Sequence, residues 1–144
     1  VLDESSRQAE IDRAAGLMNA SLLGGMDTLI FTSRELVRDS DPEKSLMIGQ
    51  AVSASLIEIV RQIDCRPRYL VAKGGITSSD VATQGLGIRR AMVMGQALPG
   101  VPVWKLGEEA AFPGMPYIIF PGNVGEDDAL ARIRKRLHQN RDRS

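Results

Sequence analysis

Apolar residues recur at helical spacing in two long segments, which predicts an amphipathic helix over residues 4–23 and another over 42–63. Gly24-Gly25 ends the first helix, and Ser40-Asp41-Pro42 begins the second with a proline in its first turn. The positions expected to face inward are Ile11, Ala14, Ala15, Met18 and Leu22 in the first helix and Ile48, Val52, Leu56, Ile59 and Ile63 in the second.

Short apolar runs rich in strand-forming residues alternate with turn residues over the rest of the chain. They predict strands at 28–33, 69–72, 88–94, 101–106 and 117–120, and shorter helices at 78–84 and 126–138, the latter with Leu130, Ile133 and Leu137 inward. A helix between buried strands favours a right-handed parallel crossover over residues 28–72. The pattern predicts an α/β fold, and we expect a three-layer sandwich with a largely parallel sheet and helices on both faces.

The chain has 144 residues, of which 43% are hydrophobic and 25% charged, as expected for one globular domain over residues 1–144. Lys plus Arg and Asp plus Glu both total 18, and this balance argues against a nucleic-acid binder. No apolar run is long enough to span a bilayer, and the polar start lacks a signal peptide. Cys65 is the single cysteine, which suits the cytoplasm. Because the chain begins at Val1, we expect it to be a piece of a longer protein.

The segment Lys73-Gly74-Gly75-Ile76-Thr77 lies at the carboxyl end of a predicted strand, where open α/β sheets bind ligands. Glycine backbone and the unpaired N–H groups of a helix start suit a phosphate, and Thr77 with Asp80 fits a capping signature. An ordinary capped turn without a ligand would explain the same residues. The spacing is not a strong functional signal, because it matches neither a P-loop nor a dinucleotide fingerprint. Lys73 is either a partner for phosphate charge or a solvated lysine.

A second glycine turn, Gly122-Asn123-Val124-Gly125, has the same strand–turn–helix context. The carboxylates of Glu126, Asp127 and Asp128 would stabilise the dipole of the following helix, but they would repel a bare phosphate. Mg²⁺ between carboxylate and phosphate would remove that conflict. A capped surface helix without a ligand is the alternative.

Other candidate residues have simpler structural explanations. His138 is the single histidine, and as a cation it suits the C-terminal end of a helix. With one histidine and one cysteine in the chain, neither a zinc cluster nor a Cys–His nucleophile pair is expected. Trp104 is expected in the core rather than stacked on a base, and Met92 and Met94 are expected to pack within a strand. The basic run at 132–136 is a solvated helix face.

Taken together, the segments Val71–Ala82 and Tyr117–Gly125 resemble the C-terminal nucleotide-binding domain of the four-carbon acid sugar kinase family, and Val101–Gly107 also fits that pattern. The resemblance runs from about residue 5 to 138. It implies the ATP-binding half of a kinase that transfers the γ-phosphate of ATP to a hydroxyl of a four-carbon sugar acid, such as a 3-oxo-tetronate, threonate or erythronate. The implied cofactors are ATP and Mg²⁺.

The resemblance implies that ATP lies against Gly74, Gly75, Ile76, Thr77 and Gly122. It assigns no catalytic residue and no metal ligand to this chain, because the family's Asp-Asp-x-Thr-Gly signature belongs to an N-terminal substrate-binding domain and has no match here. That domain of the same protein and the sugar acid are the implied partners, with no nucleic acid or membrane, and a homodimer is left open.

The sequence departs from the family at Ile76, where many members carry an acidic residue, and at Phe120-Pro121, where many carry Lys-Ser. Two alternatives to a kinase half-site stay open, and these differences motivate the first of them. One is a non-catalytic nucleotide-binding or regulatory module with the same fold, and the other is an α/β interaction domain without a ligand.

Overall fold

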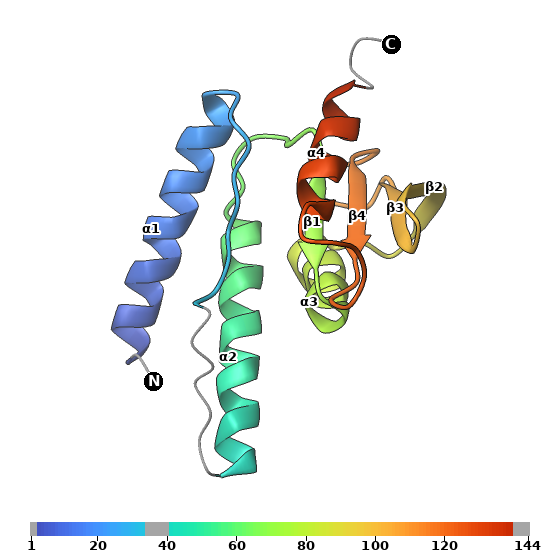
Figure 1. The fold of residues 1–144 in the computed structure, drawn as a ribbon. Coiled ribbons are helices and arrows are strands. Elements are labelled where there is room, and N and C mark those ends of the chain that lie inside the picture. The colour runs from blue at the N-terminus through green and yellow to red at the C-terminus, as the bar shows by residue number, and fades with distance from the viewer. Residues whose placement is uncertain (1–2, 34–40, 140–144) are drawn as a thin grey trace. The chain divides into compact units, whose positions relative to one another are not determined.

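A computed structural model of the chain describes residues 3–33 and 41–139, which fall into two units. The first contains residues 1–67 with 84–86, and the second contains 68–83 with 87–144. Figure 1 shows the elements of both. A single domain over the whole chain stays a prediction.

The first unit is a pair of helices, α1 (Glu4–Leu23) and α2 (Pro42–Arg61). Asp3 caps α1 and Asp41 caps α2, where proline takes the first turn as predicted. The core between the helices consists of Ile11, Ala15, Met18 and Ile59. The predicted apolar stripe of α2 is only partly correct, because Val52 is exposed and Ile57 is buried instead.

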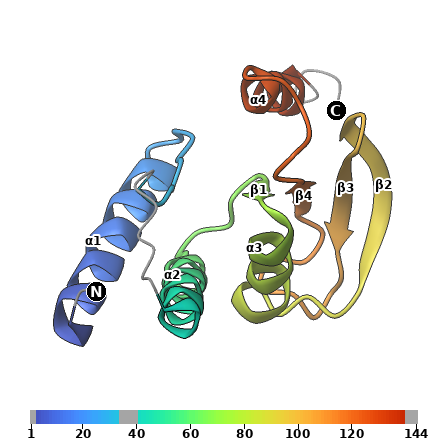
Figure 2. The same cartoon turned by 60° about the horizontal axis from the view of Figure 1, so that its bottom comes forward.

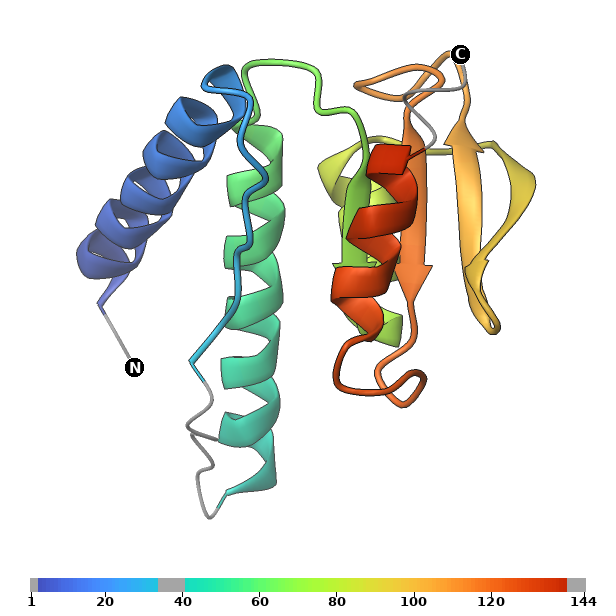
Figure 3. The same ribbon diagram turned by 45° about the horizontal axis from the view of Figure 1, so that its top comes forward.

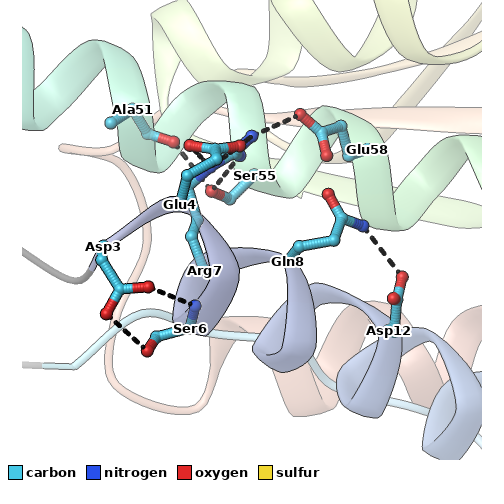
Figure 4. Close-up of polar contacts among 9 residues, drawn as sticks. All are labelled: Asp3, Glu4, Ser6, Arg7, Gln8, Asp12, Ala51, Ser55 and Glu58. Carbon is cyan, nitrogen blue, oxygen red and sulfur yellow. Dashed lines mark hydrogen bonds and ion pairs between the residues drawn. The ribbon is translucent and has the colours of Figure 1, made fainter.

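A polar cluster links the two helices beside this core (Figure 4). The guanidinium of Arg7 donates to Glu58 on α2 at 3.1 Å and to the hydroxyl of Ser55 at 3.1 Å, while it pairs with Glu4 on its own helix at 2.8 Å. These hydrogen bonds raise the pKa of Arg7, so the cation stays charged at any ordinary pH. The cluster fixes the register of α1 against α2.

The predicted strand at 28–33 was wrong. These residues form no regular element, and Leu29 and Phe31 are 67% and 74% exposed. An apolar run becomes a strand only when a neighbouring strand accepts its backbone hydrogen bonds, and the structure gives this run no such partner. The predicted parallel crossover over 28–72 is therefore absent.

The second unit is built on a four-stranded sheet with the order β1-β4-β3-β2. Its strands are β1 (Leu70–Lys73), β2 (Ala91–Leu98), β3 (Val101–Leu106) and β4 (Pro116–Phe120). Only β1 and β4 pair in parallel, whereas β2–β3 and β3–β4 are antiparallel. The α/β class is confirmed, but the sheet is mixed rather than largely parallel. The tight turn at Pro99-Gly100 makes β2–β3 a hairpin, and a hairpin pairs antiparallel.

Two helices pack on opposite faces of this sheet (Figure 2). Helix α4 (Ala129–Gln139) packs Ala129 and Ile133 against Ile118 and Phe120 of β4. Helix α3 (Gly75–Asp80), continued by a π-helical turn over Val81–Gly85, contacts the other face through Tyr117. Adjacent residues of β4 point to opposite faces, which is why one strand serves both helices. A three-layer sandwich including α1 and α2 stays a prediction.

Candidate functional site

The two glycine turns lie side by side at one edge of the sheet. Because β1 and β4 run parallel, their carboxyl ends meet, and in Figure 3 the chain leaving β4 turns there toward α4. The Gly74 N–H donates to the carbonyl of Phe120 at 2.8 Å. A Cβ added to Gly122 would lie 4.0 Å from the Cα of Gly74. The turns from distant parts of the sequence thus form one surface.

The first turn begins its helix earlier than predicted. Gly74 is the N-cap, with φ of 104° that only glycine adopts without strain, and α3 starts at Gly75 rather than Ser78. The capping signature assigned to Thr77 and Asp80 was wrong, because no side chain caps this helix. Thr77 lies within the first turn instead, and its hydroxyl takes no part in a cap.

Buried hydrogen bonds hold the first turn in place. The Ser78 hydroxyl, on a 2% exposed residue, donates to the carbonyl of Ala72 at 2.8 Å. The hydroxyl of the fully buried Tyr117 donates to the carbonyl of Ser78 at 2.7 Å. Burial raises the pKa of Tyr117, which keeps the phenol neutral and able to donate. Both strands of the parallel pair therefore anchor the start of α3.

Three backbone N–H groups are presented where the turn opens to solvent. Ser78 is the first residue of α3 whose N–H finds an acceptor behind it, the carbonyl of Gly74 at 2.9 Å. The preceding N–H groups of Gly75, Ile76 and Thr77 belong to the first turn, which has no intrahelical acceptors. Gly75 and Ile76 are exposed, and a Cβ at Gly75 would meet nothing within 4 Å. An anion can reach these groups.

Lys73 is the last residue of β1 and directly precedes the first turn. Its ammonium is 3.4 Å from the carbonyl oxygen of Gly122 and 5.1 Å from the centre of the Phe120 ring. The side chain is exposed while it makes these contacts. Lys73 is therefore an exposed lysine that directly precedes the first turn and places its ammonium near the second.

The second turn is packed more tightly than the first. Gly125 has φ of 87°, and an added Cβ would lie 2.7 Å from the Cβ of Ala129 and 3.2 Å from the Phe120 ring. Helix α4 begins at Ala129, so the expectation that the carboxylates at 126–128 occupy its first turn was wrong. They are exposed in the loop, where Asp128 lies 3.9 Å from Arg132.

The remaining candidates fall outside this surface. His138 lies near the end of α4, edge-on to Tyr69, in agreement with its structural interpretation. Trp104 is half-buried with its ring 6.4 Å from that of Tyr117, so it belongs to the sheet. The packing role expected for Met92 and Met94 was wrong, because both are more than half exposed on the edge strand β2.

A cavity of about 810 Å³ in the second unit is not part of this surface. Its lining includes Arg68, Tyr69 and Pro116, at the amino ends of β1 and β4, and it includes none of the glycine-turn residues.

Within residues 3–33 and 41–139, no group of three or more His, Cys, Asp or Glu could hold a metal ion. No helix in these ranges is long and apolar enough to cross a membrane. The paired turns are thus an open surface whose donors are backbone N–H groups and one lysine.

The chain resembles several solved structures with 17–21% identity, a level that supports the fold alone. A Salmonella typhimurium LT2 protein provisionally described as a tRNA synthase matches at 18% identity over 94% of this chain, with a TM-score of 0.67. A Haemophilus influenzae protein of family DUF1537 matches at 18% identity over 88%, with a TM-score of 0.59.

A Bordetella bronchiseptica protein of the same DUF1537 family, described as a domain-swapped dimer with bound citrate, matches at 17% identity over 87% of this chain, with a TM-score of 0.54. The chain spans 32%, 33% and 36% of the lengths of these three proteins, about a third of each. No curated protein matches it.

The sequence profile of one family covers most of the chain. It describes a nucleotide-binding C-terminal domain and matches residues 1–130. This match includes both glycine turns and confirms the resemblance drawn from their motifs. The chain therefore belongs to the family of nucleotide-binding C-terminal domains.

Proposed function

We propose that this chain is the ATP-binding half of a kinase that transfers the γ-phosphate of ATP to a hydroxyl of a four-carbon sugar acid. The observation that carries the proposal is the contact between the turns at Gly74 and Gly122 at the carboxyl edge of the parallel strands. Membership of a nucleotide-binding family supports it. The sugar-acid substrate rests on the sequence resemblance.

In this proposal the backbone N–H groups of Gly75, Ile76 and Thr77 bind the phosphates, and the Thr77 hydroxyl adds a donor. Gly122 provides the opposite wall, where the missing side chain leaves room for the nucleotide. Phosphoryl transfer depends on positioning and on neutralising charge. Mg²⁺ would come bound to ATP, and the acceptor hydroxyl and any catalytic base would come from the N-terminal domain of the same protein.

The test is calorimetric titration with ATP and Mg²⁺ of the wild type, Gly75→Asp and Gly75→Ala. Because Gly75 is exposed, unstrained and at a helix start, aspartate is compatible with the fold while it places a negative charge beside the phosphates. We expect Gly75→Asp to weaken ATP binding about tenfold or more, a difference of about 1.4 kcal/mol. Gly75→Ala, the uncharged control, should bind within about threefold of wild type.

Equal affinity of all three proteins would remove the first turn from the site, and a wild type that binds no nucleotide would overturn the proposal.

A second test measures catalysis, because the proposal gives this chain only half of the active site. We expect no phosphorylation of a tetronate by this chain alone, and sugar-acid-dependent ATP consumption once the N-terminal domain is present. Robust turnover by the isolated chain would contradict the half-site.

A second candidate is a nucleotide-binding regulatory module without catalysis. Two apolar residues favour it, Ile76, which is 79% exposed beside the proposed phosphate-binding N–H groups, and Phe120. The family pattern that the sequence resembles has charged residues at these positions. The measurement that separates the two is ATP consumption by the longer protein. Binding without turnover in the presence of an intact Asp-Asp-x-Thr-Gly domain would favour the module.

We also propose that the protein is a cytoplasmic homodimer. The described domain-swapped state of the Bordetella bronchiseptica protein supports the dimer, and a single cysteine suits a reducing compartment. Light scattering coupled to gel filtration measures the mass directly. A mass of one chain at all concentrations would contradict the dimer.

A further inference from the structure

The register of the parallel pair gives Lys73 a defined place. Lys73 is the last residue of β1 and lies opposite Phe120, the last residue of β4. One residue further on, the first glycine turn begins at Gly74, and Gly122 follows two residues after Phe120. The lysine thus stands where the strands end, with its ammonium over the Phe120 ring and near the Gly122 carbonyl.

These contacts leave most of the binding capacity of the ammonium unused. The distance of 3.4 Å to the Gly122 carbonyl oxygen is long for a hydrogen bond, and an ammonium carries three donors. The Phe120 ring attracts the cation and restricts where it lies without consuming a donor. None of the ion pairs found among the described residues involves Lys73. Its charge is available to an anion from solution.

The charges around the site give this cation a role. Three exposed carboxylates, those of Glu126, Asp127 and Asp128, follow the second turn and would repel a polyphosphate. The N–H groups of the first turn supply only partial positive charge. Lys73 adjoins that turn in the sequence and reaches the second turn in space, so it can offset repulsion where the phosphates would lie.

We infer that Lys73 binds the phosphates of the nucleotide and gives the site its preference for polyphosphate over the bare nucleoside. This inference rests on the proposed function. The adjacent turns position the nucleotide through uncharged backbone groups, while Lys73 supplies the full charge that makes affinity depend on the number of phosphates.

The experiment compares the wild type, Lys73→Met and Lys73→Arg in titrations with Mg²⁺–ATP, AMP and adenosine. Methionine keeps the length and apolar stem but removes the charge. We expect Lys73→Met to weaken ATP binding about tenfold, to weaken AMP less, and to leave adenosine within about twofold. The affinity of Lys73→Met for ATP should also depend less on salt than that of the wild type. Lys73→Arg should recover part of the ATP affinity.

Lys105→Met is the matched control. Lys105 is another exposed strand lysine, but it pairs with Pro116 and so lies at the amino end of β4, away from both turns. Its ATP affinity should equal that of the wild type.

The inference is overturned if Lys73→Met binds ATP like the wild type while Gly75→Asp remains defective, a result that leaves the proposed function intact. It is also overturned if Lys73→Met loses adenosine as strongly as ATP, because the lysine then does not discriminate between ligands by their phosphates. A wild type that binds none of the three ligands overturns the proposed function, and the inference with it.

Discussion

The two glycine turns share a pattern in sequence but are stabilised differently. Buried hydrogen bonds hold the first turn, from the Ser78 hydroxyl to the Ala72 carbonyl and from the Tyr117 hydroxyl to the Ser78 carbonyl. The solvent side of this turn, at Gly75, is open. The second is held by packing, because Gly125 fits against Ala129 and the Phe120 ring with no space for a side chain. In the first turn glycine therefore leaves open space beside the N–H groups, and in the second it allows close packing against the core.

This difference shows that a glycine in a strand-to-helix turn does not by itself indicate a ligand site. What distinguishes the first turn is that N–H groups without helical acceptors coincide with open space. In the second turn, α4 starts four residues after Gly125, so Gly122 rather than a helix start faces the first turn. Stability measurements on single variants test the comparison directly.

The largest effect is expected from Gly125→Ala. Alanine at φ of 87° is strained, and its Cβ would lie 2.7 Å from that of Ala129. Strain and overpacking together should lower the free energy of unfolding by about 2–4 kcal/mol. Trp104, the single tryptophan and a residue of β3, reports unfolding of this unit by its fluorescence in a urea titration.

Gly87→Ala controls for backbone strain alone, since Gly87 has φ of 66° but nothing within 4 Å of an added Cβ. It should cost about 1 kcal/mol. Equal losses in the two variants would mean that packing does not hold the second turn.

A smaller effect is expected from Tyr117→Phe. The variant keeps the buried ring but loses the hydrogen bond to the Ser78 carbonyl, so the free energy of unfolding should fall by about 1 kcal/mol. Since this bond anchors the start of α3, ATP affinity should fall as well, more than in a core variant of similar stability loss such as Ile118→Val. Unchanged affinity would show that the anchor does not position the N–H groups proposed to bind phosphate.

The smallest effect on stability is expected from Gly75→Ala. Gly75 is unstrained, open and at a helix start, where alanine has the higher helix propensity. The free energy of unfolding should stay within about 0.5 kcal/mol of wild type, or rise slightly. A loss of unfolding free energy as large as that of Gly125→Ala would mean that glycine is needed for packing in both turns.

The sequence alone determined the elements whose signals are local. The spacing of Ile11, Ala15 and Met18 predicted α1, Pro42 marked the start of α2, and the run at Val101–Leu106 predicted β3 to the residue. The glycine motifs also indicated the nucleotide-binding family, because their order and strand context are read along the chain. Each of these depends on residues close together in sequence.

Tertiary structure decided what depends on distant partners. The run at 28–33 has strand-forming residues but no neighbouring strand, and β4 pairs in parallel only with β1 because the β2–β3 hairpin occupies its other side. The contact of Gly74 with Gly122, and the position of Lys73 over Phe120, follow from that pairing across almost 50 residues. Local patterns cannot fix such pairings, since backbone hydrogen bonds in a sheet join segments whose separation the chain itself does not specify.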